Sequence, residues 1–292
     1  MSFKQELSRI AADVDKVLDE MLTPLPDHPR EMMDIARYAA LDAGKRLRAF
    51  LTVQTAGLFG APYESALRAG ACIEMVHNSS LIHDDLPCMD NDTVRRGRPS
   101  VWAKYGEWRA MLAGDLLLNW PFRILAIDEK ISENAAVRAK LAEILSSSTQ
   151  GMIDGQLMDK LAEQGEFQDQ AGVNKIQSLK TGCMFNACTM FGATLGNASA
   201  EQRAALKKFT DAMGLCFQIT DDILDAVGDP AQVGKTLGKD ANKATYVKLV
   251  GVDGARAKAA ELAALAKYAL SIFDERADNL REMMDYMVSR ES

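Results

Sequence analysis

The chain has 292 residues, of which 48% are hydrophobic and 26% charged, and its formal net charge is −7. This length can bury a sizeable core, and the acidic balance excludes a general affinity for nucleic acid, so that any basic patch must be local. Only 8 prolines are present, and Val, Ile and Thr form no regularly spaced runs bounded by turns. This composition predicts an all-α protein in which no stretch is a strand.

Cysteine usage and the first residues bear on the compartment. The five cysteines are odd in number and form no CxxC pair, as expected for reduced thiols in a cytoplasm. Residues 1–22 carry acidic side chains throughout, without an apolar stretch long enough for a signal peptide or a membrane span. We therefore expect a soluble cytoplasmic protein with no stable membrane anchor. No linker or internal repeat interrupts the chain, so residues 1–292 are predicted to form a single domain.

The first basic group follows two predicted helices, Ser2 to Leu22 and Glu31 to Leu41, whose apolar residues recur at helical spacing. The next residues, DAGKRLRAF, place a glycine before Lys45, Arg46 and Arg48. A flexible backbone and free N–H groups at the start of the following helix add to the attraction for an anion such as diphosphate. The alternative is a solvated basic face.

A dense acidic group lies where the next predicted helix, Tyr63 to Asp85, runs into the stretch LIHDDLPCMDNDTVRRGRPS. Its four aspartates repel one another at neutral pH unless a cation neutralises them. Oxygen-only ligands favour Mg²⁺, which also keeps water ligands that a phosphate can replace. Pro87 disfavours helix, so the chain can bend and bring Asp90 back towards Asp84. A solvated loop at a helix end is the alternative.

Glu74 and His77 form an ExxH motif within that helix. A di-iron site in a helical bundle needs two such motifs, and neither of the other two histidines has a glutamate three residues before it, so we reject that interpretation. His77 lies about two turns before Asp84 on nearly the same face, which indicates a role beside the anion or else a buried core histidine.

Three further helical stretches are predicted to surround the same cavity. Arg109 to Ile127 is an apolar helix, and Asn134 to Leu161 is a helix expected to kink at GMIDGQLMD, which holds two glycines. The run IQSLKTGCMF places Lys180 and Thr181 in an apolar setting. A half-buried lysine needs an anion, so both residues are candidates to bind one.

The second acidic group, FQITDDILD, is embedded in an apolar helix. Asp221 and Asp225 are four residues apart, and Asp222 and Asp225 three, so their Cβ atoms lie roughly 5–6 Å apart on one face. That spacing suits a shared metal shell. The following GKTLGKD and KATY supply lysines on glycine-rich loops, the chemistry expected for holding phosphate oxygens.

Taken together, these motifs resemble the trans-isoprenyl diphosphate synthases. DDLPCMDNDTVRRG is similar to the first Asp-rich motif of that family and FQITDDILD to the second, while GKRLR, His77, KTG and GK…D…KATY occur in the family's order. The resemblance covers nearly the whole chain. It implies a bundle of about ten or more helices around a deep central cavity, a homodimer, and Mg²⁺ as cofactor, with three ions when substrate is bound.

The resemblance also implies roles for individual residues. Metal binding falls to Asp84, Asp85, Asp90 and Asp221, with Asp222 and Asp225 in support. Catalysis falls to the four metal-binding aspartates together with Arg95 and Lys180. The allylic diphosphate is assigned to Arg95, Lys180, Thr181, Gln218 and Lys235. Isopentenyl diphosphate is assigned to Lys45, Arg48, His77 and Arg96. The chain departs from the usual family residues, without losing a required charge, at Ala43, Ala49, Trp102, Asn242 and Val247.

The reaction implied is the condensation of isopentenyl diphosphate with dimethylallyl, geranyl or farnesyl diphosphate to a C15–C20 prenyl diphosphate. Ser79 and Ser80, one turn before Asp84, are small and leave room for a longer product, which favours geranylgeranyl over farnesyl diphosphate. Trp120 or Met75 is a candidate floor that would favour the shorter one. Three other classes remain as alternatives: a class I terpene cyclase, a non-catalytic partner subunit and a plain helical scaffold.

Overall fold

The computed structural model describes residues 2–27, 29–41, 44–227 and 245–289, and nearly all regular structure in them is helical. The α-helices are α1 (Phe3–Met21), α2 (Arg30–Ala40), α3 (Leu47–Leu58), α4 (Tyr63–Asp84), α5 (Val101–Tyr105), α6 (Glu107–Ile127), α7 (Ala135–Glu163), α8 (Gln170–Gln177), α9 (Cys183–Leu195), α10 (Ala200–Val227), α12 (Tyr246–Ala269) and α13 (Asp278–Ser289). A π-helix, η1 (Ser178–Gly182), joins α8 to α9, and a 3₁₀ turn, η3 (Glu275–Ala277), precedes α13. The predicted all-α bundle of about ten or more helices is confirmed.

The expectation of no strand is wrong at one place. Strands β1 (Val94–Arg95) and β2 (Arg98–Pro99) pair antiparallel as a hairpin of two residues each. Arg96 has a φ of 53° and Gly97 a φ of 75°, the left-handed conformation of a tight hairpin turn. Such a short ladder leaves no periodicity in the sequence, because the turn rather than a run of β-formers makes it.

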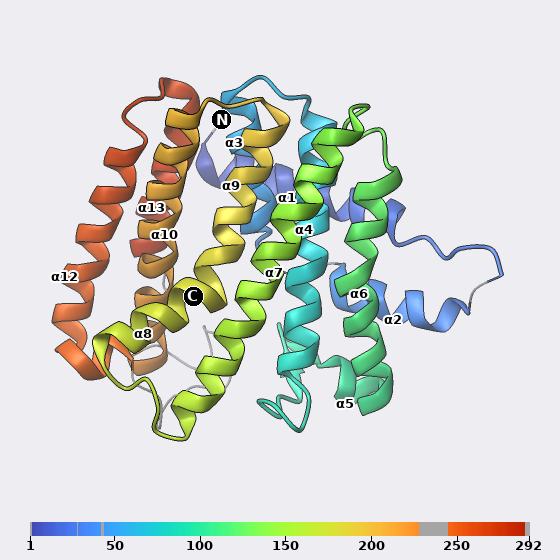
Figure 1. The fold of residues 1–292 in the computed structure, drawn as a ribbon. Coiled ribbons are helices and arrows are strands. Elements are labelled where there is room, and N and C mark those ends of the chain that lie inside the picture. The colour runs from blue at the N-terminus through green and yellow to red at the C-terminus, as the bar shows by residue number, and fades with distance from the viewer. Residues whose placement is uncertain (1, 28, 42–43, 228–244, 290–292) are drawn as a thin grey trace.

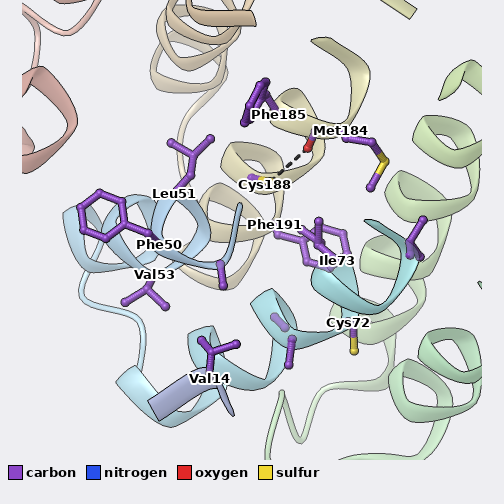
Figure 2. Close-up of a cluster of buried hydrophobic side chains, with 14 of the residues drawn as sticks. Val14, Phe50, Leu51, Val53, Cys72, Ile73, Met184, Phe185, Cys188 and Phe191 are labelled. Carbon is purple, nitrogen blue, oxygen red and sulfur yellow. Dashed lines mark hydrogen bonds between the residues drawn. The ribbon is translucent and has the colours of Figure 1, made fainter. Parts of the chain in front are cut away.

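The hydrophobic core lies where α3, α4 and α9 meet, with α1 closing one side (Figure 2). Phe50 and Leu51 of α3, Ile73 of α4, and Phe185 and Phe191 of α9 are each fully buried. Each large apolar side chain removed from water stabilises the fold by about 1.5–3 kcal/mol. This rigid centre fixes the position of the helix ends that carry the polar motifs.

Helix α6 is the one helix in the described ranges that is long and apolar enough to cross a membrane by length and composition. Its buried face, which includes Ala113, Leu117 and Trp120, packs against α4, as in the core helix of a globular bundle. Trp120 also donates from Nε1 to the Met21 carbonyl at 2.9 Å. The helix is therefore weak support for a membrane span.

The polar motifs gather at one end of the bundle. The C-terminal ends of α4, α7 and α10 all point to the lower end in Figure 1. Helix α7 runs without interruption through GMIDGQLMD, the stretch at which the sequence predicts a kink. Gly155 instead allows close packing, because a Cβ there would lie 2.2 Å from the Lys180 backbone nitrogen.

Candidate functional site

The first acidic group is a loop folded back onto the end of α4. The helix ends at Asp84, and the Asp90 amide then donates to the Asp84 carbonyl at 2.8 Å. In the same way the Asp92 amide donates to the Asp85 carbonyl at 3.1 Å. The predicted return of Asp90 towards Asp84 is thus observed, since a broken helix frees these carbonyls to accept from the returning chain.

The two adjacent aspartates of this loop have different surroundings. Asp85 is 2% exposed, and Arg95 donates to it from Nε at 3.1 Å and also from Nη2. Asp84 is half-buried and faces the cavity. Burial raises the pKa of Asp84 to about 6, with the charge of Asp90 adding to the rise and that of Lys180 opposing it. Because burial disfavours the charged form of this carboxylate, a cation beside it would be stabilising.

Asp90 is held from α7. The Lys160 ammonium donates to Asp90 Oδ1 at 2.8 Å, and to the Met89 carbonyl at 3.3 Å. It also pairs with Glu163 Oε1, three residues further along the same helix, at 3.1 Å. The departure at Trp102 adds a further tie, because its Nε1 donates to the Asp92 carbonyl at 2.7 Å. The loop is therefore fixed from both sides.

Lys180 and Thr181 lie in the π-helix η1, a type of distortion often found at functional sites. The Lys180 ammonium donates to Asp159 Oδ2 at 2.6 Å, so the anion that the sequence required is a carboxylate of α7. The Thr181 hydroxyl lies 3.5 Å from Gln218 Oε1 on α10. Of the residues predicted beside the allylic diphosphate, the structure thus brings Lys180, Thr181 and Gln218 close together.

The second acidic group is on α10, as predicted, and its members differ in burial. Asp222 is 5% exposed and accepts from the Tyr246 amide at 3.0 Å and from Gln218 Nε2 at 3.3 Å. Asp221 and Asp225 are half-buried. Asp222 therefore anchors the start of α12, which agrees with a supporting role, and Asp221 is the more accessible of the adjacent pair.

The basic group at the start of α3 is split by the fold. Arg46 is 2% exposed and pairs inwards with Asp15 and Glu74, so it is part of the core rather than of an anion site. Arg48 lines the cavity, with its guanidinium 5.1 Å from the centre of the Phe185 ring. Lys45 is exposed above the Tyr286 ring.

Arg96 reaches the same area from the hairpin. Its Nη1 donates to Asn78 Oδ1 at 3.1 Å, and its guanidinium lies against Gly44, where a Cβ would be 3.0 Å from Cζ. Gly44 has a φ of 80°, which glycine adopts readily. Burial and the charges of Arg48 and Arg96 lower the pKa of His77, so its imidazole is neutral at physiological pH.

These groups border a cavity of about 460 Å³ whose lining is partly polar and partly apolar. The polar lining includes Arg48, His77, Asp84, Lys180 and Thr181. The apolar lining comes from α4, α6, α7 and α9: Leu81, Leu118, Met152, Ile153, Leu157 and Met184. Neither Trp120 nor Met75 lines it, so the expectation that one of them forms its floor is wrong.

The remaining candidates stand around this cavity or outside the described residues. Asp85, Arg95 and Arg96 line a smaller neighbouring pocket, and Gln218 and Lys180 line another. Lys235 lies outside the described residues, as do Ala43 and Asn242. Within the described ranges, no three His, Cys, Asp or Glu side chains are gathered closely enough to hold a metal ion.

The aspartates of the first acidic group can nevertheless hold Mg²⁺ if substrate oxygens complete its coordination. Mg²⁺ in nucleotide and phosphate sites is held by one or two carboxylates and completed by water and substrate oxygens, rather than by an all-protein cage. Asp84, which lines the cavity, and Asp90, whose amide bonds to the Asp84 carbonyl, offer hard oxygen donors, and Lys180 lines the same cavity as a cation for the rest of a diphosphate. The residues present therefore suit a metal that arrives with its anion.

Sequence reasoning missed the partners that α7 supplies. Asp159 and Lys160 are adjacent, yet one holds Lys180 and the other Asp90. Their only signal was a charged pair within the GMIDGQLMDK stretch of an otherwise apolar helix. No spacing rule within a helix indicates which distant residue such a pair meets.

Comparison with known proteins gives a consistent result along the chain. Residues 29–287 match the family described as Polyprenyl synthetase. The chain is 36% identical to the chloroplastic geranylgeranyl pyrophosphate synthase of Capsicum annuum, over 100% of this chain and 79% of that protein. It is also 36% identical to the farnesyl diphosphate synthase of Escherichia coli, over 99% of both chains.

Solved structures show the same relationship in three dimensions. The crystal structure of an FPP/GFPP synthase from Zymomonas mobilis superposes with a TM-score of 0.89 at 39% identity, covering 98% of this chain and 99% of that one. A geranyltransferase from Legionella pneumophila superposes with a TM-score of 0.88 at 26% identity, covering 99% and 97%.

Proposed function

Because the chain belongs to the polyprenyl synthetase family, we propose that it is a short-chain trans-prenyl diphosphate synthase that condenses isopentenyl diphosphate with allylic diphosphates. The observation that carries the proposal is the cavity lined both by Arg48, His77, Asp84, Lys180 and Thr181 and by apolar side chains. A lining that combines charged and apolar side chains matches a substrate with a diphosphate head and a hydrocarbon tail.

We assign the metal to Asp84, Asp90 and Asp221. Asp85 is a further ligand in this proposal, when its carboxylate contacts the metal as well as Arg95. Bound Mg²⁺ supplies charge neutralisation for the departing diphosphate. Three ions with substrate bound, as the resemblance implies, belong to the same proposal. Asp85 and Asp222 are the buried members of the two adjacent pairs and hold the fold beside the site.

The cations of the chain itself bind and orient the two substrates. Lys180, Thr181, Gln218, Arg95 and Lys235 are proposed at the allylic diphosphate, where Lys180 exchanges Asp159 for phosphate oxygens. Lys45, Arg48, His77 and Arg96 are proposed at isopentenyl diphosphate. Preorganised cations stabilise negative charge as it develops, without waiting for solvent to reorganise. The apolar wall excludes water, which would otherwise quench an allylic cation.

The proposed principal product is geranylgeranyl diphosphate, with farnesyl diphosphate as the alternative. Ser79 and Ser80 both line the cavity, and each carries a small side chain. The Ser79 hydroxyl donates to the Gly114 carbonyl at 2.8 Å and so lies flat against α6. Since Trp120 and Met75 stand outside the lining, the tail can extend past both serines towards Leu118 and Met184.

Product analysis tests the proposal directly. The purified protein is incubated with isopentenyl diphosphate, an allylic diphosphate and Mg²⁺, and the dephosphorylated products are separated by chromatography. We expect one linear twenty-carbon alcohol. A fifteen-carbon alcohol alone would contradict the chain length, a hydrocarbon would indicate a cyclase, and no product would indicate a non-catalytic subunit. We further propose a homodimer in the cytoplasm without a nucleic-acid partner or stable membrane anchor.

Substitution at Ser80 sharpens the product assignment. Ser80 is half-buried and its hydroxyl donates to the His77 carbonyl, so a larger side chain can enter the cavity without a new buried clash in the core. We expect Ser80→Phe to shift the product to fifteen carbons or fewer while turnover stays within about tenfold, because no transition-state charge is removed. Ser80→Ala is the matched control and should leave the product unchanged.

A further inference from the structure

Lys160 stands between helix α7 and the first acidic loop. Its ammonium contacts three oxygen groups, Asp90 Oδ1 at 2.8 Å, Glu163 Oε1 at 3.1 Å and the Met89 carbonyl at 3.3 Å. The side chains of Lys160 and Asp90 are 24% and 29% exposed, so the pair is partly shielded from water. Hydrogen bonds to Asp90 and Glu163 raise the pKa of Lys160 despite its partial burial, so it is charged at neutral pH.

The preceding residue of α7, Asp159, carries the opposite charge and binds a cation of the site. Asp159 accepts from Lys180 at 2.6 Å, while Lys160 donates to Asp90 at 2.8 Å. Helix α7 therefore supplies a carboxylate to a cation of the site and an ammonium to an acid of the site. In the protein alone, one acid and one cation of the proposed site, Asp90 and Lys180, are thus each engaged by α7.

An ammonium surrounded by oxygens takes the position that a divalent cation would seek beside Asp90. Two cations beside one carboxylate oxygen repel each other, so the ammonium lowers the affinity of Asp90 for a divalent cation. A divalent cation displaces the ammonium only when its other ligands, including substrate oxygens, contribute more binding free energy than is lost with the ion pair and with the water removed from the metal.

We propose that Lys160 is a built-in competing cation, a positioning residue that holds Asp90 against α7 and is displaced when a divalent cation binds together with diphosphate. This inference rests on the metal assignment of the proposed function. It predicts that the first acidic loop engages a divalent cation only when an anion accompanies it. Premature metal binding is disfavoured, and Glu163 retains the displaced ammonium close by.

The effect is measured as metal affinity in the absence of turnover. The full chain is titrated with Mn²⁺ without and with inorganic diphosphate, in the absence of any prenyl substrate. Free Mn²⁺ is followed by its electron paramagnetic resonance signal, against a protein-free blank that corrects for the Mn²⁺ that diphosphate itself chelates. Lys160→Gln should lower the dissociation constant for Mn²⁺ by about two- to tenfold, the range expected for a partly exposed ion pair. Lys160→Arg keeps the charge and should stay within about twofold of the wild type by the same reasoning.

The same helix offers a matched control. Lys140 pairs with Glu143 at 2.8 Å, with the same i,i+3 spacing as Lys160 and Glu163, and both members of this pair are exposed on the surface. Lys140→Gln removes the same charge from α7 and should leave the dissociation constant unchanged. Thermal melting of each variant by circular dichroism verifies that the fold is retained.

The outcomes separate this inference from the proposed function. If the wild type binds Mn²⁺ and diphosphate but Lys160→Gln binds with equal or lower affinity, the competing role is wrong and the metal assignment stands. If Lys140→Gln tightens binding as much as Lys160→Gln, the effect is general charge rather than competition at Asp90. If the wild type binds no Mn²⁺ with diphosphate, both the metal assignment and this inference fail.

Discussion

The two acidic groups share a sequence pattern and differ in backbone. At α4 the aspartates occupy a helix end and a returning loop, whereas at α10 they occupy one face of an unbroken helix. In both, the second residue of an adjacent Asp–Asp pair is buried, Asp85 against Arg95 and Asp222 against the Tyr246 amide. The first residue, Asp84 or Asp221, is half-buried.

In each adjacent pair, one aspartate is therefore available to the site and the other stabilises the fold. Successive residues at a helix point about 100° apart, so one carboxylate can face the site while the next faces the core. The buried one needs a hydrogen-bond donor and thereby fixes a neighbouring segment, the hairpin in one case and the start of α12 in the other. The loop at α4 has additional freedom, which Lys160 restricts from α7.

The largest expected effect is on turnover and compares the two more accessible aspartates, Asp84 and Asp221. We expect Asp84→Ala and Asp221→Ala each to lower turnover by about a hundredfold or more, because each removes a preorganised charge that transition-state stabilisation needs. Steady-state kinetics of the purified variants measure this. Asp211→Ala, at the exposed end of an i,i+4 pair on α10, is the control. Wild-type turnover in Asp221→Ala alone would mean that only the first group holds metal.

A second, intermediate effect tests the buried member of the pair on α10. Asp222→Ala leaves the Tyr246 amide without its acceptor, which should lower the free energy of unfolding by about 1–3 kcal/mol. Asp211→Ala removes a surface ion pair with Lys207 and should cost less than about 1 kcal/mol. Urea denaturation followed by circular dichroism compares the two variants. Equal stability would show that Asp222 is not needed to anchor α12.

The smallest effect concerns the pH dependence of stability at Asp84. Its pKa is raised from 3.8 to about 6, so the folded protein holds a proton that the unfolded chain has released between those values. The charged form therefore destabilises the fold above about pH 6, and this loss disappears as pH falls towards 4. Asp84→Asn should then stabilise the protein at pH 7.5 by about 1 kcal/mol after solvent screening, and by much less at pH 4.5.

Denaturation midpoints at those two pH values decide the matter. A stability difference between Asp84→Asn and the wild type that stays constant with pH would mean that Asp84 titrates normally. A gain in stability paired with the loss of turnover expected for Asp84→Ala would instead mark Asp84 as a residue kept for function at the expense of the fold.

Much of the fold followed from local sequence. The sequence predicted α1, α2 and α4 to within one or two residues, because their apolar residues recur at helical spacing. Pro87 indicated correctly that the chain turns after Asp84. The hairpin was not predicted because two-residue strands have no periodicity. Gly155 suggested a kink because the sequence does not distinguish a glycine that bends a helix from one that lets another element approach closely.

The sequence by itself determined the helical class, the order of the charged motifs and the chemistry that they suit, since these depend on residue type and on spacing within one element. Tertiary structure alone decided which charge meets which. Arg46 turned inwards to Asp15 and Glu74, Lys180 met Asp159, and Lys160 met Asp90 across 70 residues of chain. Helical spacing fixes the face on which a side chain stands, whereas its partner across the bundle depends on how whole helices pack.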